Sequence, residues 1–182
     1  MKRECTVEEA RLKAETYCAM SEHCTDDVCR KLEQWGVPLT AYDSILEHLK
    51  KEKYVDDRRY AIAFVRDKYR FNQWGRMKIA QSLRLKHIDS ESINLAMEEI
   101  DEGEYQEILL SLLRKKLPAI KAKSDYERNG KLIRFAAGHG YCMDEILLCL
   151  KQIGCEDDCF DGFVATFFPS MLFIVRQAPS ER

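Results

Sequence analysis

The chain has 182 residues, of which 46% are hydrophobic and 33% are charged, and its formal net charge is −2. This balance is enough to bury a core and excludes an intrinsically disordered protein. The longest apolar stretch, residues 162–175, is interrupted by Thr166, Pro169 and Ser170 and is too short to cross a bilayer. Residues 1–11 carry charges throughout instead of the basic and then apolar pattern of a signal peptide. We therefore expect a cytoplasmic protein without a membrane span.

Helical signals recur along the chain, and its four prolines and eight glycines are few for a turn-rich β protein. Thr6 with Glu9, and later Ser124 with Glu127, have the spacing of capping boxes, in which two side chains satisfy free N–H groups at a helix start. Apolar residues repeat at helical spacing between these signals. The sequence predicts an all-α fold with helices near residues 6–20, 25–35, 40–52, 57–71, 75–86, 90–100, 104–121, 124–137 and 143–153.

An internal sequence repeat shows how these helices are grouped into units. Residues 28–37 align with residues 79–88, 51 positions later, and both align with residues 146–155 after a further 67. In this alignment the third copy ends before its last helix. Units this small must pack on their neighbours, which predicts three tandem three-helix repeats in an elongated, curved molecule. We place the repeats at residues 1–55, 56–102 and 103–155, followed by a hydrophobic C-terminal extension of unknown role at residues 156–182.

The eight cysteines do not have the spacing of metal ligands. No Cys-x-x-Cys pair occurs, and the four histidines form no pair at helical spacing. We expect reduced thiols that act as small apolar residues, and no metal or other cofactor. The chain also lacks a Gly-rich phosphate loop and a nucleophile–base set, and the segment from Gly138 to Gly140 is read as a turn between helices. We therefore predict that the protein is not an enzyme.

Charge alternates in blocks along the chain. Residues 58–86 hold nine Lys/Arg and one acid, residues 87–113 hold eight acids and no Lys/Arg, and residues 114–134 hold eight Lys/Arg and two acids. Such blocks are either solvated faces or surfaces that bind a polyanion or an acidic protein face.

Two segments of the second repeat carry a family resemblance. Residues 54–68 read Tyr-Val-Asp-Asp-Arg-Arg-Tyr-Ala-Ile-Ala-Phe-Val-Arg-Asp-Lys, and residues 74–83 read Trp-Gly-Arg-Met-Lys-Ile-Ala-Gln-Ser-Leu. They resemble the RecX signature, in which an Asp opens a helix with a Tyr-Ala element and Gly-Arg leads the next helix. Residues 24–37 resemble the opening repeat of the same family, and the likeness covers residues 6–154. Two features depart from the family pattern: Lys86-His87 stands where the family has Lys-Gly, and residues 156–182 extend past the usual family end.

The resemblance implies a regulatory protein with three tandem three-helix repeats that binds the filament of the RecA recombinase on DNA. Such a protein inhibits or modulates filament growth, ATP hydrolysis and strand exchange in DNA recombination, DNA repair and the SOS response. Direct contact with DNA is left open, and we expect a monomer. The alternative is a helical nucleic-acid-binding module that acts without RecA, because short helix pairs resemble helix-turn-helix units.

One predicted helix carries the main candidate surface for a partner. At 100° per residue, Arg59, Arg66 and Arg70 lie within about 40° of one another, opposite an apolar face. We predict that this arginine stripe binds phosphates or carboxylates of the partner. A solvated face, or ion pairs with the acids of residues 87–113, is the alternative. Weaker candidates are the other cations of the second repeat: Arg58, Lys68, Arg76, Lys78, Arg84 and Lys86.

Overall fold

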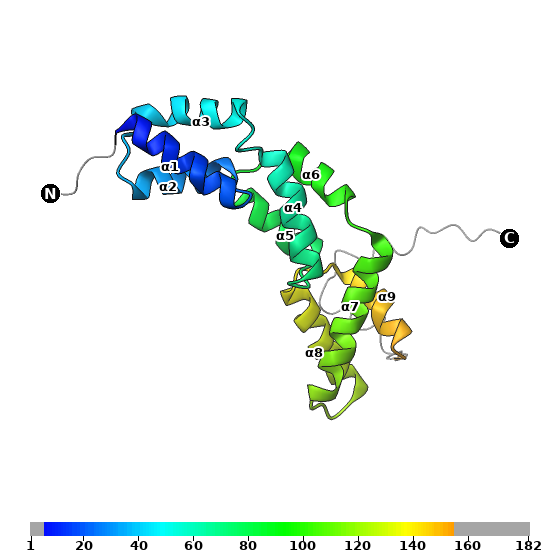
Figure 1. Cartoon of the computed structure of the whole chain (residues 1–182). Helices are drawn as coiled ribbons and strands as arrows, with labels where there is room; N and C mark the ends of the chain where they lie inside the picture. Colours follow the sequence, from blue (N-terminus) through cyan, green and yellow to red (C-terminus); the bar gives the residue numbers. More distant parts are fainter. Residues whose placement is uncertain (1–5, 155–182) are drawn as a thin grey trace.

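A computed structural model describes residues 6–154, and this part of the chain is helical throughout, without strands (Figure 1). The all-α prediction is confirmed, and each predicted helix is present. The α-helices are α1 (Val7–Met20), α2 (Thr25–Gln34), α3 (Tyr42–Lys51), α4 (Asp57–Arg70), α5 (Arg76–Arg84), α6 (Ser90–Glu98), α7 (Glu102–Lys116), α8 (Asp125–Gly138) and α9 (Met143–Gln152), with short 3-10 helices η1 (Leu39–Ala41) and η2 (Leu117–Ala119).

The clearest error in the predicted boundaries concerns α7, which was expected to reach residue 121. It ends at Lys116 and continues as η2, in which Pro118 occupies one of the first two positions. Proline has no backbone N–H to donate to the preceding turn, and its ring clashes with the carbonyl four residues earlier. Pro118 was therefore a signal in the sequence that α7 ends before residue 121.

Short polar side chains begin several of the helices. Thr6 and Glu9 form the predicted capping box of α1. At α8 only half of the predicted box forms: Ser124 accepts from the N–H of Glu127, but the Glu127 carboxylate accepts from the N–H of Lys123, 2.9 Å away. Aspartates accept from the N–H group three residues later at the starts of α4, α6 and α7, namely Asp56, Asp89 and Asp101.

The helices form three consecutive units, α1–α3, α4–α6 and α7–α9, which follow a curved path (Figure 1). The first unit has its own core, built around Ala14, Leu32 and Leu49. The second and third units share a single core that includes Tyr69 and Leu150. The predicted series of stacked repeats is therefore present, but the second and third repeats form one continuous packed body.

The third copy of the repeat lies elsewhere than the sequence alignment placed it. After α2, α5 and α8 the chain turns in the same way: the N–H groups of Val37, Ile88 and Tyr141 donate to carbonyls five residues earlier, at 3.0, 3.2 and 3.3 Å. All three side chains are buried. Residues 132–141 are thus the third copy, 53 positions after the second, and the alignment with residues 146–155 was wrong. The third unit has its last helix, α9, because α7, α8 and α9 occupy the three positions of the repeat.

One residue of each such turn has a left-handed backbone. Gly36 has φ of 73° and Gly140 has φ of 91°, whereas the second repeat has His87 at φ of 58°. Glycine adopts this conformation without steric cost, whereas a side chain with a Cβ atom is strained there. His87, which stands where the family has glycine, therefore adopts the same turn but makes the protein less stable than glycine would.

Several expectations concern features that the structure describes only in part. Within residues 6–154 no helix is long and apolar enough to cross a membrane, and no group of three or more His, Cys, Asp or Glu side chains is placed to hold a metal ion. The cysteines of this range are free thiols: Cys18, Cys24, Cys29, Cys142 and Cys149. The predicted C-terminal extension, residues 156–182, lies outside the described residues.

We predict that His87→Gly stabilises the protein, because it removes the steric strain of a side chain at positive φ. The expected gain is about 0.5–1 kcal/mol, or about 2–3 °C in Tm for a chain of this size, measured by thermal unfolding. Gly36→Ala, at the equivalent turn of the first repeat, should shift Tm downwards by a similar amount. A destabilised His87→Gly variant would show that the His87 side chain contributes more than its backbone costs.

Candidate partner-binding surfaces

The arginine stripe lies on the exposed face of α4, and each of its side chains is about half exposed. Arg59 binds Glu22 with 2.8 Å between Nε and Oε1. The other two pair with acids of the 87–113 block: Arg66 with Glu99, and Arg70 with Glu104 at 2.8 Å. The stripe therefore connects α4 to the α1–α2 turn, to the end of α6 and to the start of α7.

Two donors hold the carboxylate of Glu104. Arg70 donates from Nε and Nη2, at 3.0 and 2.8 Å, and Tyr69 donates its hydroxyl at 2.8 Å. These hydrogen bonds, Arg70 first, lower the pKa of Glu104 because they favour its ionised form. The alternative given for the stripe, ion pairing with the acidic block, is thus present in the fold. A role of the stripe in partner binding stays a prediction.

The junction between the first two repeats contains another predicted site residue, Lys86. Its ammonium lies 2.6 Å from Asp27 of α2, and both side chains are largely buried. Burial alone would lower the pKa of Lys86, but the hydrogen bonds with Asp27 and Tyr60 outweigh it and raise the pKa. The pKa of Asp27 is lowered: burial opposes ionisation, and hydrogen bonds from Lys86 and Cys24 outweigh it. Lys86 therefore supports the fold instead of facing solvent.

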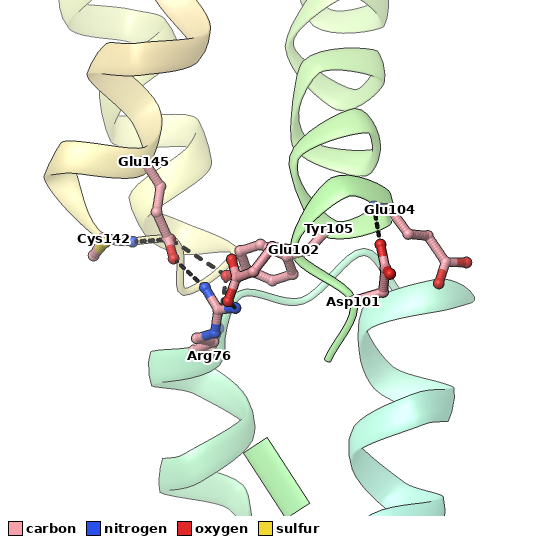
Figure 2. Close-up of polar contacts among 7 residues, drawn as sticks. All are labelled: Arg76, Asp101, Glu102, Glu104, Tyr105, Cys142 and Glu145. Carbon is pink, nitrogen blue, oxygen red and sulfur yellow. Dashed lines mark hydrogen bonds and ion pairs between the residues drawn. The ribbon is translucent and has the colours of Figure 1, made fainter. Parts of the chain in front are cut away.

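Arg76 occupies the corresponding place between the second and third repeats (Figure 2). Its guanidinium pairs with Glu102 at the start of α7 and with Glu145 of α9, at 2.8 Å from the latter. It also lies over the ring of Tyr105, 4.3 Å from the centroid. The Tyr105 hydroxyl accepts from the N–H of Arg76 at 3.0 Å and donates to Glu145 at 3.3 Å. Arg76 is thus a linking residue whose partners lie 26 and 69 positions away in sequence.

The backbones of the second and third repeats touch beside this network. The N–H of Gly75 donates to the carbonyl of His139 at 2.8 Å, and the N–H of Met77 donates to that of Gly140 at 3.1 Å. A Cβ atom on Gly75 would lie 2.2 Å from the carbonyl carbon of Gly140, and one on Gly140 would lie 2.3 Å from the Cβ of Lys78. Gly138 is the last residue of α8, so the predicted turn consists only of His139 and Gly140, whose carbonyls accept from the start of α5.

A hollow of about 690 Å³ opens next to this contact, between α5, α6 and the end of α8. Its walls are mixed: Met77, Ala80, Ile93 and Met97 supply apolar surface, and three predicted site cations reach it. We call it the α5 hollow, and its cations are Arg76, Lys78 and Arg84.

The predicted site residues therefore fall into three groups. Five are engaged in ion pairs: Arg59, Arg66, Arg70, Arg76 and Lys86. Lys68 and Lys78 lie over aromatic rings, both within reach of Trp74, at 5.5 and 4.4 Å from its centroid. Arg58 and Arg84 are exposed and have no ion pair among residues 6–154.

Sequence reasoning missed the apolar part of this surface. Met77 of α5 is 63% exposed and Leu85, the residue that caps the C-terminus of α5, is 67% exposed, whereas the buried face of α5 consists of Ile79 and Leu83. The available signal was their position: apolar residues at 77 and 85 lie outside the buried face of an amphipathic helix. The acidic partners Glu22 and Glu145 gave no such signal, because only the tertiary structure brings them to the arginines.

The chain matches known proteins over most of the described range. Residues 56–97 match the family model of the second three-helix domain of RecX, and residues 103–150 match that of the third. The regulatory protein RecX of Pseudomonas fluorescens is 30% identical over 152 residues, which cover 84% of this chain and 96% of that protein. The RecX proteins of Bacillus mycoides (26% identical) and Clostridium botulinum (32% identical) align over 84% and 67% of this chain. The chain spans only about half the length of these two relatives, 56% and 58%.

Two crystal structures show the same fold. RecX from Lactobacillus salivarius superposes with a TM-score of 0.73 at 18% identity, over 82% of this chain and 97% of that one. A second structure of a regulatory protein RecX gives a TM-score of 0.70 at 22% identity, over 82% and 75% of the two chains.

We predict that the Asp27–Lys86 pair makes stability depend on pH. The pKa of Asp27 is lower in the folded state than in the unfolded one, so the stabilisation is present above about pH 4 and is lost as pH falls through the folded pKa. Asp27→Asn should lower the free energy of unfolding by about 2 kcal/mol at pH 7 and by much less at pH 3. Urea unfolding at both pH values measures this. Asp67→Asn, at an exposed site of α4, is the control, and a loss that does not change with pH would contradict the assignment.

Proposed function

The chain belongs to the RecX family of regulatory proteins, and on that basis we propose that it binds the RecA–DNA filament and inhibits or modulates recombinase activity. The observation that carries the proposal is the family match, which includes both the second and the third repeat and nearly the full length of the Pseudomonas fluorescens relative. The protein acts as a cytoplasmic monomer without a cofactor and performs no catalysis of its own. Its targets are filament growth, ATP hydrolysis and strand exchange.

The shape of the molecule supports a role in binding a filament. Three helical units follow a curved path, so the protein offers a long surface rather than an enclosed pocket (Figure 1). A filament presents repeated subunits along its length, and an elongated helical array is suited to contact more than one of them. This geometry favours a regulator that occupies part of the filament surface.

Within that surface, the α5 hollow is the best candidate for direct contact with RecA. It combines apolar walls, including the exposed Met77, with Lys78 and Arg84. Protein interfaces typically have an apolar centre and a polar rim, and cations at the rim increase the rate of association with an acidic partner. Neither Lys78 nor Arg84 forms an ion pair among the described residues, so a partner carboxylate does not have to displace one.

The arginine stripe requires a different mechanism, because Glu22, Glu99 and Glu104 already hold its side chains. A partner phosphate or carboxylate has to replace these acids at half-exposed positions. Exposed ion pairs contribute only about 0–1 kcal/mol each, so the exchange is not costly. The stripe thus remains a second proposed contact, with the acids of the fold as competitors.

The first test measures RecA activity. The purified chain should reduce the DNA-dependent ATPase and strand exchange of RecA, and with ATP but no RecA it should release no phosphate. Both activities are followed at stoichiometric amounts of the two proteins on single-stranded DNA. Unchanged RecA activity would refute the proposed function for this chain.

The second test separates the two surfaces. Lys78→Glu with Arg84→Glu should raise the concentration needed for half-inhibition by about tenfold or more, because it places repulsive charges at the rim of the α5 hollow. Lys50→Glu with Lys51→Glu, exposed on α3, imposes the same change in charge and should have little effect. Equal effects of the two double variants would indicate a nonspecific effect of net charge.

The arginine stripe is tested by substituting the acidic residues that pair with it in the fold. Glu99→Gln with Glu104→Gln keeps the shape of both side chains and releases Arg66 and Arg70. If the stripe contacts RecA, this variant inhibits at lower concentration than the wild type. If the stripe only stabilises the fold, the melting temperature falls and inhibition does not improve.

A further inference from the structure

The part of the third repeat where α7 leads into α8 concentrates positive charge, most of which forms no ion pair within the described residues. Residues 114–134 form the last turn of α7, η2, the connection to α8 and the first part of α8, and they carry eight cations and two acids. Both acids are paired within the segment, Asp125 with Arg128 and Glu127 with Lys131. The other six cations, here called the distal basic patch, form no ion pair among the described residues: Arg114, Lys115, Lys116, Lys121, Lys123 and Arg134.

In the second repeat, by contrast, most of the cations form ion pairs. It has more cations in sequence, nine in residues 58–86, but five of them pair with acids from other segments. Acids from the α1–α2 turn, α2, α6, α7 and α9 supply this compensation. No described acid outside the 114–134 segment forms an ion pair with the distal basic patch. The two basic blocks look alike in sequence, but among the described residues acids from other segments compensate most of the first block and none of the second.

Helix stability does not account for the whole patch. Arg114, Lys115 and Lys116 lie in the last turn of α7, where cations complement the helix dipole, and Lys116 also lies 4.9 Å from the ring centroid of Phe135. Lys121 and Lys123 immediately precede α8, where the positive end of the dipole disfavours cations. These two exposed lysines therefore add repulsion to the folded protein. An anionic ligand would remove that repulsion.

The chemistry of the patch fits a phosphate backbone better than a protein face. It extends along α8 to Arg134, which lies about 13 Å along the helix from its first residue, a span of several phosphates on one strand. Protein interfaces rely on buried apolar or aromatic anchors, and the exposed Met77 lies on α5, away from the patch. The patch segment does expose Tyr126, at 45%, and an aromatic ring beside basic side chains can also stack on a nucleic-acid base. The shallow hollow of about 490 Å³ at Arg114 and Lys115 is lined partly by Glu107, which forms no ion pair with either cation.

We propose that the distal basic patch binds the phosphate backbone of nucleic acid, at a surface separate from the α5 hollow. The contact is electrostatic and independent of base sequence, since contacts from lysine and arginine to phosphates carry no information about the bases. Binding at this end leaves the α5 hollow accessible to a protein. The inference does not depend on RecA being the protein partner.

The test uses the full chain and fluorescein-labelled single- and double-stranded DNA, without RecA. Anisotropy gives Kd at several salt concentrations. Lys115→Gln, Lys121→Gln and Lys123→Gln together should weaken binding about tenfold at low salt and reduce the slope of log K against log salt by about two. Lys50→Gln, Lys51→Gln and Lys53→Gln, exposed lysines at the end of α3, remove the same charge from the first repeat and should leave the slope unchanged.

Three outcomes would overturn the proposal. In the first, the wild type binds DNA without salt dependence. In the second, both triple variants lose affinity equally, which indicates an effect of diffuse net charge. In the third outcome, DNA binding stays intact in the distal variant while inhibition of RecA weakens, and the partner of the patch is then an acidic protein. Arg114→Gln with Arg134→Gln, on the helices themselves, tests the same surface if the first triple variant has an altered melting curve. Failure of the RecA assay with normal DNA binding would refute only the proposed function.

Discussion

The N–H groups at the start of a helix have no partner within that helix, and in this protein two helices take their acceptors from the next repeat. At α2, Asp57 of α4 accepts from the backbone N–H and the hydroxyl of Thr25, at 2.7 and 2.6 Å. At α5, the carbonyls of His139 and Gly140 accept from Gly75 and Met77. The second helix of a repeat is therefore completed only when its neighbour is in place. These hydrogen bonds tie each of the first two repeats to the repeat that follows it.

Charge reinforces the same two junctions. Lys86 pairs with Asp27 across the first junction, and Arg76 joins Glu102 and Glu145 across the second. Largely buried pairs of this kind are costly to break, because a single remaining charge is left without compensation. The cations of the second repeat are thus mostly committed to holding repeats together. The cations that form no ion pair among residues 6–154 include Lys78 and Arg84 at the α5 hollow and the six members of the distal basic patch.

The two cores divide the molecule into two parts, one made of the first unit and one made of the second and third units. The second and third units share one core, so the α5 hollow and the distal basic patch lie on the same packed body. The first unit has a separate core and joins that body through polar contacts and through Cys24, which belongs to the larger core. Two proposed binding surfaces at a fixed mutual position fit a protein that contacts a filament of protein and nucleic acid at once.

The sequence by itself determined the helices and the capping box at Thr6 and Glu9, because these depend on residues three to five positions apart, and the similarity of residues 28–37 to 79–88 revealed the repeat. The 3.6-residue period placed Tyr60, Ala61 and Val65 in the core and Arg59, Arg66 and Arg70 on the opposite face. It did not determine the register of the third copy, since the buried pattern of α9 resembles that of α2 and only the turn at Gly140 identifies the equivalent helix. Nor did it determine which cations remain unpaired. Arg76 meets Glu145 across 69 residues and Lys86 meets Asp27 across 59, and such distant charges are brought within hydrogen-bonding distance only by the packing of the repeats.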